Sequence, residues 1–117
     1  MINSTSLIAL DCFIESHSQV IRGLKVISDI DLANLFEIKL YYLYKKIDAN
    51  IIRFPDDFML VLTHPEKQKY RCKRYAFTES GLFMLSGLLK SKRAIRISID
   101  LIYLLVDKQP GLIYKLL

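Results

Sequence analysis

The spacing of apolar residues along the first two thirds of the chain predicts short strands that pair as hairpins. β-prone apolar residues flank Gly23, whose backbone freedom suits a tight turn, so residues 18–28 are expected to form one hairpin. The nearly continuous apolar run FMLVLT at 58–63 predicts a buried strand. The run RYAFT at 74–78 predicts its antiparallel partner, and the polar residues 64–73 predict a basic loop at the hairpin tip, like the wing of a winged helix-turn-helix.

Two short helices are predicted between these hairpins. Ser28 followed by Asp31 has the spacing of a helix N-cap, and Asp29 and Asp31 suit the positive end of a helix dipole. A second helix is predicted over Lys39–Ile52, because apolar residues recur there at helical spacing. These apolar residues are Leu40, Leu43, Ile47 and Ile51. Two short helices joined by a turn of about three residues form the pattern of a helix-turn-helix.

Two further helices are predicted toward the C-terminal end. The first covers Glu79–Leu89, where Gly81 and Gly87 would allow close packing at some cost in helix propensity. The second covers residues 92–107 and carries two apolar stripes. The expected caps of these helices are Thr78 and Ser91. One stripe is Ile95, Ile99, Ile102 and Val106, and the other is Ile97, Leu101 and Leu104. A helix that is apolar on two sides is either central in the core or shared with a partner.

The length of 117 residues is that of one domain with a modest core. The hydrophobic fraction of 52% and the charged fraction of 25% are typical of a folded soluble protein. The expected fold class is α+β: a helix-turn-helix with small β-hairpins, winged-helix-like, and two C-terminal helices. Its core would cover residues 20–107. Residues 1–19 would form an N-terminal arm, either as a short helix or as a docking segment, and residues 108–117 an apolar tail.

Positive charge is concentrated in one part of the chain. The formal net charge is +5, and residues 64–96 hold nine Lys and Arg against two Asp and Glu. This distribution is typical of a protein with an anionic partner. It indicates either a solvated basic face or a surface that binds phosphates.

Patterns typical of catalysis or of cofactor binding are missing from the sequence. His17 and His64 are isolated, and Cys12 and Cys72 form no CxxC pair, so no metal site and no cofactor are predicted. No phosphate-binding glycine motif and no nucleophile signature occur, so we predict that the protein is not an enzyme and has no small-molecule substrate. No secretory signal and no apolar run long enough for a membrane is found. We therefore expect a cytoplasmic protein with reduced cysteines.

The second predicted helix carries polar and aromatic residues on the face opposite its apolar stripe. We expect Tyr41, Lys45 and Asn50 to contact base edges, with Asn50 suited to adenine. Tyrosine hydroxyls at positions 41, 42 and 44 could bind phosphate or sugar. The remaining candidates for DNA contact are Tyr42, Lys46, Lys67, Lys69, Arg71, Lys73, Arg74, Lys90, Lys92 and Arg93. The alternative is an ordinary polar helix face.

Three segments, taken in order, resemble a known family. They are IRGLKVISDIDLANLF, LYKKIDANIIRFPDDFMLVLT and YAFTESGLFMLSGLLKSKRAI. Together they resemble the KilA-N-related N-terminal domain of phage antirepressor-type proteins, the "ORF-six N-terminal" family. The resemblance implies a DNA-binding domain with a regulatory role in phages and prophages, and it does not imply catalysis. This sequence departs from the family pattern at Glu37, where a glycine is usual, and at Asp48 and Ala49, where basic residues are usual.

The first hypothesis is therefore a phage-type regulator or antirepressor that binds duplex DNA through the helix-turn-helix and the basic loop. The second hypothesis is an interaction module, in which the apolar last helix binds another copy of the chain or a partner protein. The size of the protein in solution would distinguish the two hypotheses.

Overall fold

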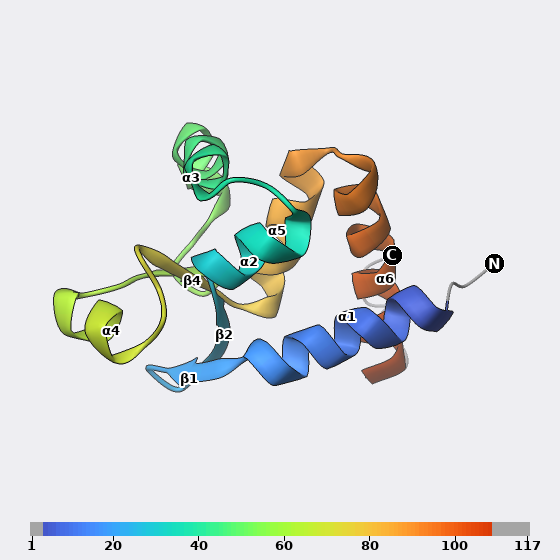
Figure 1. Ribbon diagram of the computed structural model, residues 1–117, viewed down its shortest axis with the longest axis horizontal. Coiled ribbons are helices and arrows are strands. Elements are labelled where there is room, and N and C mark those ends of the chain that lie inside the picture. The colour runs from blue at the N-terminus through green and yellow to red at the C-terminus, as the bar shows by residue number, and fades with distance from the viewer. Residues whose placement is uncertain (1–3, 109–117) are drawn as a thin grey trace.

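A computed structural model of the protein describes residues 4–108, which form helices packed around one small sheet (Figure 1). The helices are α1 (Ser4–His17), α2 (Asp29–Phe36), α3 (Leu40–Ala49), α4 (His64–Lys69), α5 (Glu79–Leu89) and α6 (Lys92–Lys108), with a 3₁₀ helix at Ile51–Arg53. The strands are β1 (Gln19–Ile21), β2 (Leu24–Ser28), β3 (Met59–Val61) and β4 (Tyr75–Phe77). The predicted α+β class is confirmed. Most of the predicted apolar tail lies outside the described residues.

The four strands form an antiparallel sheet in the order β1-β2-β4-β3. Both predicted hairpins are confirmed, and pairing of Ile27 with Phe77 joins them into one sheet. The first hairpin turns at Arg22 and Gly23, whose φ angles are 54° and 77°. Two positive φ angles in succession are what a two-residue hairpin turn with the native twist requires.

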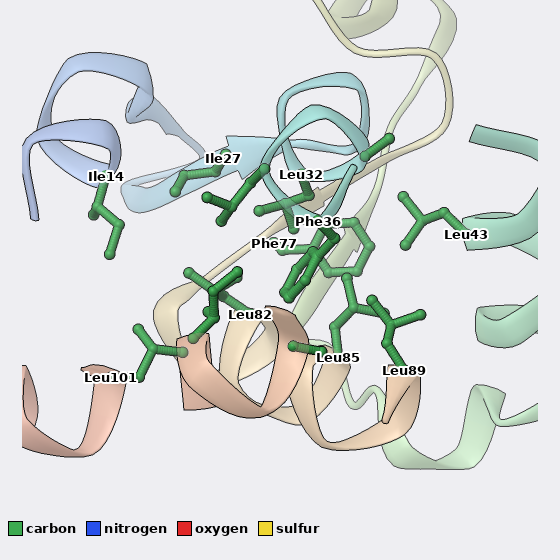
Figure 2. Close-up of a cluster of buried hydrophobic side chains, with 14 of the residues drawn as sticks. Ile14, Ile27, Leu32, Phe36, Leu43, Phe77, Leu82, Leu85, Leu89 and Leu101 are labelled. Carbon is green, nitrogen blue, oxygen red and sulfur yellow. The ribbon is translucent and has the colours of Figure 1, made fainter. Parts of the chain in front are cut away.

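The main core lies between the sheet, α2 and α5 (Figure 2). Figure 2 shows Phe36 and Phe77 at its centre, with Leu82 and Leu85 of α5 beneath them. α1 adds Ile14 and α6 adds Leu101 at one side of the same cluster. Of the predicted N-terminal arm, residues 4–17 therefore form a helix, α1, which adds to the core and packs along α6.

The predicted helix caps are confirmed by side-chain hydrogen bonds. Ser28 accepts a hydrogen bond from the backbone N–H of Asp31, Thr78 accepts one from Gly81, and Ser91 accepts one from Ala94. Each bond satisfies a donor that the first turn of a helix leaves free, and so fixes where α2, α5 and α6 begin.

Gly81 allows the close packing that we expected, but Gly87 does not take part in it. A Cβ atom on Gly81 would lie 2.0 Å from the carbonyl oxygen of Phe58, so only glycine lets α5 approach the start of β3. A Cβ atom on Gly87 would meet nothing within 4 Å, because this residue faces outward. The prediction for Gly87 is therefore wrong.

The predicted loop over residues 64–73 is wrong in part, because its first half forms helix α4. Thr63 and Glu66 form a capping box around the first turn, and Pro65 provides a φ angle suited to a helix start. Lys67 and Lys69 therefore lie on a helix, and only Tyr70 to Arg74 return to β4 as a loop.

The predicted second helix is too long at its C-terminal end. α3 ends at Ala49, and a 3₁₀ turn follows. Leu43 and Ile47 are buried as predicted, whereas Ile51 is 51% exposed. The tighter 3₁₀ turn rotates Ile51 away from the apolar face of α3.

Candidate nucleic-acid interface

The exposed face of α3 is held in place by its buried stripe. Leu43 and Ile47 are fully buried, and they anchor the helix against α2 and α5. On the opposite side Tyr41 is 74% exposed and Tyr42 is 40% exposed, and Lys45 is exposed beside them. Lys46 lies at the rim, with its Nζ atom 5.6 Å from the centroid of the Tyr42 ring. This face offers aromatic rings and cations to solvent.

A first groove lies along one side of α3, between that helix and the start of β4. It has a volume of about 320 Å³ and is lined by Tyr41, Tyr44, Lys45, Asp48 and Arg74. The Arg74 guanidinium stacks over the Tyr44 ring at 4.5 Å from its centroid. This cation–π contact places a charge from the basic loop next to α3.

A second groove lies between the C-terminal end of α3 and the C-terminal end of α5. It has a volume of about 420 Å³, and its polar lining residues are Lys46, Asn50, Arg53 and Lys90. Sequence reasoning missed Arg53. Arg53 lies in the 3₁₀ turn that follows α3, so helical spacing gave no signal for its place. α3 thus lies between two grooves that both carry cations.

A buried carboxylate connects the basic loop to α3. Asp29 of α2 is 0% exposed, and its oxygens accept hydrogen bonds from the backbone N–H groups of Lys73, Arg74 and Tyr75 at 3.1, 2.8 and 3.1 Å. The Tyr44 hydroxyl of α3 donates to the same carboxylate at 2.6 Å. The loop backbone and α3 are therefore held by one side chain. Sequence reasoning assigned Asp29 only to the helix dipole.

A family model described as the ORF6N domain matches residues 16–88, more than half of the chain. The chain belongs to the ORF6N family. Comparison with curated proteins and comparison with solved structures each gave no match. The ORF6N segment begins at the end of α1 and ends within α5, so it contains α2, α3, α4 and the whole sheet.

The ORF6N segment contains every lining residue of the first groove and all but Lys90 of the polar residues in the second. Asp29 and the loop that it holds also lie within the segment. Lys90, Lys92 and Arg93 follow it. The two grooves around α3 are thus almost wholly features of the ORF6N domain.

The hydroxyl of Tyr44 is not placed as the sequence analysis predicted. It points inward to Asp29 rather than outward. Burial and the hydrogen bond to Asp29 raise the pKa of Tyr44, so this hydroxyl stays a donor to the carboxylate. In the ORF6N domain Tyr44 therefore fixes the position of α3, and its ring supports Arg74.

Asn50 forms the C-terminal cap of α3. Its side-chain nitrogen donates to the carbonyl oxygen of Lys46 at 2.9 Å, and its backbone N–H donates to Ile47. A bidentate contact with adenine would use a hydrogen of the same NH₂ group. Because this group has two hydrogens, one can keep the cap bond while the other donates to a base.

Two other groups of predicted contact residues lie apart from α3 in the ORF6N protein. Lys67 and Lys69 are exposed on α4, which Figure 1 shows at the opposite end of the molecule from α6. Arg22 in the first hairpin turn binds Glu66 of α4 at 2.6 Å. This arginine, together with hydrogen bonds from Thr63, lowers the pKa of Glu66 to about 2. α4 is therefore tied to the first hairpin.

Lys92 and Arg93 line a third groove, of about 640 Å³, between α1 and α6. The Arg93 Nε atom donates to the carbonyl oxygen of Leu35 at 2.5 Å, and its guanidinium lies 3.8 Å from Glu37. Arg93 is thus already engaged at the C-terminal end of α2. Arg71 and Lys73 are exposed on the loop that Asp29 holds.

The described part of the ORF6N protein contains no group of three or more His, Cys, Asp or Glu side chains placed to hold a metal ion. Within residues 4–108, no helix has the length and apolar character needed to cross a membrane. Both cysteines are free thiols, as expected, with Cys12 exposed and Cys72 buried.

Proposed function

We propose that this ORF6N protein binds duplex DNA, with the exposed face of α3 in the major groove. Tyr41 and Lys45 would contact base edges, and so would Asn50, whose cap bond to Lys46 holds its side chain in place. The observation that carries the proposal is the convergence of Arg74 and Lys90 on the two sides of α3, although α5 and β4 separate them along the chain. A recognition helix flanked by cations can be held by both phosphate backbones of one groove.

Phosphate contacts would come from four places on the molecule. Lys46, Arg53 and Lys90 would act from the second groove. The loop held by Asp29 would supply Arg71, Lys73 and Arg74, and α4 would supply Lys67 and Lys69. Lys92 and Arg93 would reach only DNA that extends past the start of α6. Such contacts provide affinity independent of sequence, while α3 provides the specificity.

We further propose that the DNA contact has a regulatory role, as a transcriptional regulator or antirepressor of phage or prophage type. The resemblance of three ordered segments to KilA-N-related antirepressor domains supports this role. The proposal requires binding alone, and no catalytic step.

The test is binding of a random-sequence duplex, measured by fluorescence anisotropy over a salt series. The key variants are Arg74→Ala and Lys90→Gly, which each remove a cation beside α3. Lys90 has a φ angle of 54°, so glycine relieves its backbone while removing the charge. We expect each variant to weaken binding and to lower the salt slope by about 0.9, the value for one lost phosphate contact.

The matched control is Lys25→Ala, which removes the same charge from β2, where Lys25 binds Glu15. Its affinity and salt slope should equal those of the wild type. If the wild-type protein shows no binding at low salt, or if Lys25→Ala weakens binding as much as Arg74→Ala does, the proposal is wrong.

A second candidate function is self-association through α6, because only one of its two apolar stripes is covered. Ile97, Leu101 and Leu104 are buried. In the other stripe Ile95, Ile99 and Ile102 are 52%, 38% and 46% exposed. These three positions follow the alternating four- and three-residue spacing of a two-helix seam, which suits the same stripe on a second copy.

The test of self-association is molar mass by light scattering over a range of concentrations. The expected result is a dimer that Ile99→Glu converts to a monomer. A wild-type monomer at every concentration would reject this second function without affecting the DNA proposal.

A further inference from the structure

Asp29 is the most enclosed charged group of the interface. Its carboxylate has no exposed surface and accepts hydrogen bonds at both oxygens. Besides the loop N–H groups and the Tyr44 hydroxyl, the N–H of Ile30 donates to it at 2.9 Å. Burial of a carboxylate is costly unless such donors surround it. An apolar residue of similar size at this position would leave these donors unpaired.

The loop segment that Asp29 holds is the one whose side chains face DNA in the proposed function. The backbone N–H groups of residues 73–75 point inward to the carboxylate, while the side chains of Lys73 and Arg74 are exposed. Buried N–H groups must be paired, and here a side chain from α2 replaces the partner strand that would otherwise pair them. Asp29 therefore holds the backbone of the loop and leaves the Lys73 side chain exposed, while the Arg74 guanidinium also stacks on the Tyr44 ring.

The Tyr44 hydroxyl extends this arrangement to α3. It donates to the same oxygen of Asp29 that accepts from Arg74 and Tyr75. The ring of Tyr44 also lies beneath the Arg74 guanidinium. α3 and the loop are consequently both bonded to the Asp29 carboxylate, and neither can shift without breaking a hydrogen bond to this buried charge.

We infer that Asp29 is a positioning residue for DNA binding, which fixes the distance between the α3 face and the cations of the loop through Tyr44. This inference rests on the proposed function. A duplex presents its phosphates at fixed spacing, so two contact elements bind together only when their separation matches that spacing. Asp29 sets the separation of α3 and the loop before DNA binds, so binding requires no ordering of the loop.

The test compares two tyrosines that each lose only a hydroxyl. Tyr44→Phe removes the bond between α3 and Asp29 but keeps the ring beneath Arg74. The matched control is Tyr75→Phe, which removes a hydroxyl bond of 3.3 Å from β4 to Asp48 of α3. The Tyr75 side chain lines neither groove around α3.

We expect Tyr44→Phe to weaken DNA binding about tenfold, as loss of a bond to a charged group does, and to lower the salt slope. Tyr75→Phe should bind within about twofold of the wild type, because its hydroxyl bond is exposed and long. Measurements well below the melting temperature compare folded proteins only. A purely structural role of Asp29 would change stability there, but not affinity or salt slope.

A second measurement does not involve DNA. Amide hydrogen exchange at residues 73–75 should be slow in the wild type. In Asp29→Asn it should be at least about tenfold faster at one or more of these residues, because one of the two acceptor oxygens becomes an NH₂ group, which cannot accept a hydrogen bond. Unchanged exchange in Asp29→Asn would overturn the inference, and so would wild-type affinity in Tyr44→Phe. If the wild type binds no DNA at all, the proposed function fails. The exchange data then still show whether Asp29 holds the loop.

Discussion

Two buried carboxylates, Asp29 of α2 and Asp100 of α6, have different kinds of partner. Asp29 is 0% exposed and receives backbone N–H groups from a loop. Asp100 of α6 is 1% exposed and meets side chains, since it accepts a hydrogen bond from Ser6 of α1 and lies 3.3 Å from Arg96. Asp29 thus holds the backbone of an irregular loop, whereas Asp100 links side chains of α1 and α6.

The two carboxylates differ in which other contacts would hold their partners if the carboxylate were removed. α1 and α6 also share apolar contacts and are complete helices without Asp100. The loop at residues 70–74 has no regular structure of its own, and the N–H groups of Lys73 and Arg74 donate to Asp29 instead of to a partner strand. A buried charge that pairs with irregular backbone is therefore harder to replace than one that pairs with side chains.

The largest effect should come from Asp29→Ala compared with Asp100→Ala. We expect Asp29→Ala to lower the free energy of unfolding by about 3–5 kcal/mol, because several buried donors lose their acceptor at once. Asp100→Ala should lower it by about 2 kcal/mol, since two side chains, Ser6 and Arg96, lose an acceptor rather than a set of backbone N–H groups. Urea denaturation measures both values. Equal losses would show that the two carboxylates are used alike.

The next effect is a loss of unfolding free energy at alkaline pH, which we expect from Cys72 and Tyr44, two groups that interact with Asp29. Burial raises the pKa of Cys72 from its usual value near 9 to about 12, and the pKa of Tyr44 is raised as well. The folded state therefore holds protons that the unfolded state releases. Stability should be complete below pH 9 and should fall by about 2 kcal/mol by pH 11.

The control for this alkaline loss uses the two cysteines. Cys72→Ala should flatten the decline in unfolding free energy between pH 9 and pH 11. Cys12→Ala should not, because Cys12 is exposed on α1. An identical decline in both variants would place the titrating groups elsewhere in the protein.

A smaller effect is expected at Asp100, where a substitution should change the unfolding free energy but not the affinity for DNA. Asp100→Asn keeps the size of the side chain and an acceptor for Ser6 but loses the ion pair with Arg96. We expect a loss of about 1 kcal/mol in unfolding free energy, with DNA affinity unchanged. A weaker affinity for DNA would show that the α1–α6 side takes part in binding.

The smallest effect should be a gain in unfolding free energy from a substitution at Glu37, which lies at the end of α2 and near Arg93 of α6. Glu37 ends α2 with a φ angle of 57°, a conformation that costs a residue with a Cβ atom about 1 kcal/mol. Glu37→Gly should raise the unfolding free energy by about 0.5–1 kcal/mol, and thermal or urea denaturation would measure it. A loss instead would mean that the contact between Glu37 and Arg93 outweighs the backbone strain.

Local patterns in the sequence predicted much of the fold. Caps at Ser28, Thr78 and Ser91 act within one helical turn, so their signals are complete in the sequence. The signal for α4 was also local, since Thr63 and Glu66 have the spacing of a capping box, and the basic composition of the segment masked it. Local chemistry was thus sufficient wherever the stabilising contacts lie within a few residues.

The candidate site was less predictable, because its contacts join distant parts of the chain. The exposed face of α3 followed from helical spacing. The anchoring role of Asp29 did not, since nothing near residue 29 indicates that residues 73–75 will meet it. The two stripes of α6 are equally apolar, so spacing alone could not show which one faces the core. Packing of α1 and α5 decides this.

The bonds from Asp29 to the loop span 44 to 46 positions of the chain. During synthesis α2 and α3 emerge long before the loop that Asp29 will hold. The loop can be anchored only after Tyr75 has been added and β4 has paired with β2. Long-range contacts of this kind form late, because chain closure must come first. An incompletely translated or misfolded chain would therefore lack the assembled contact surface.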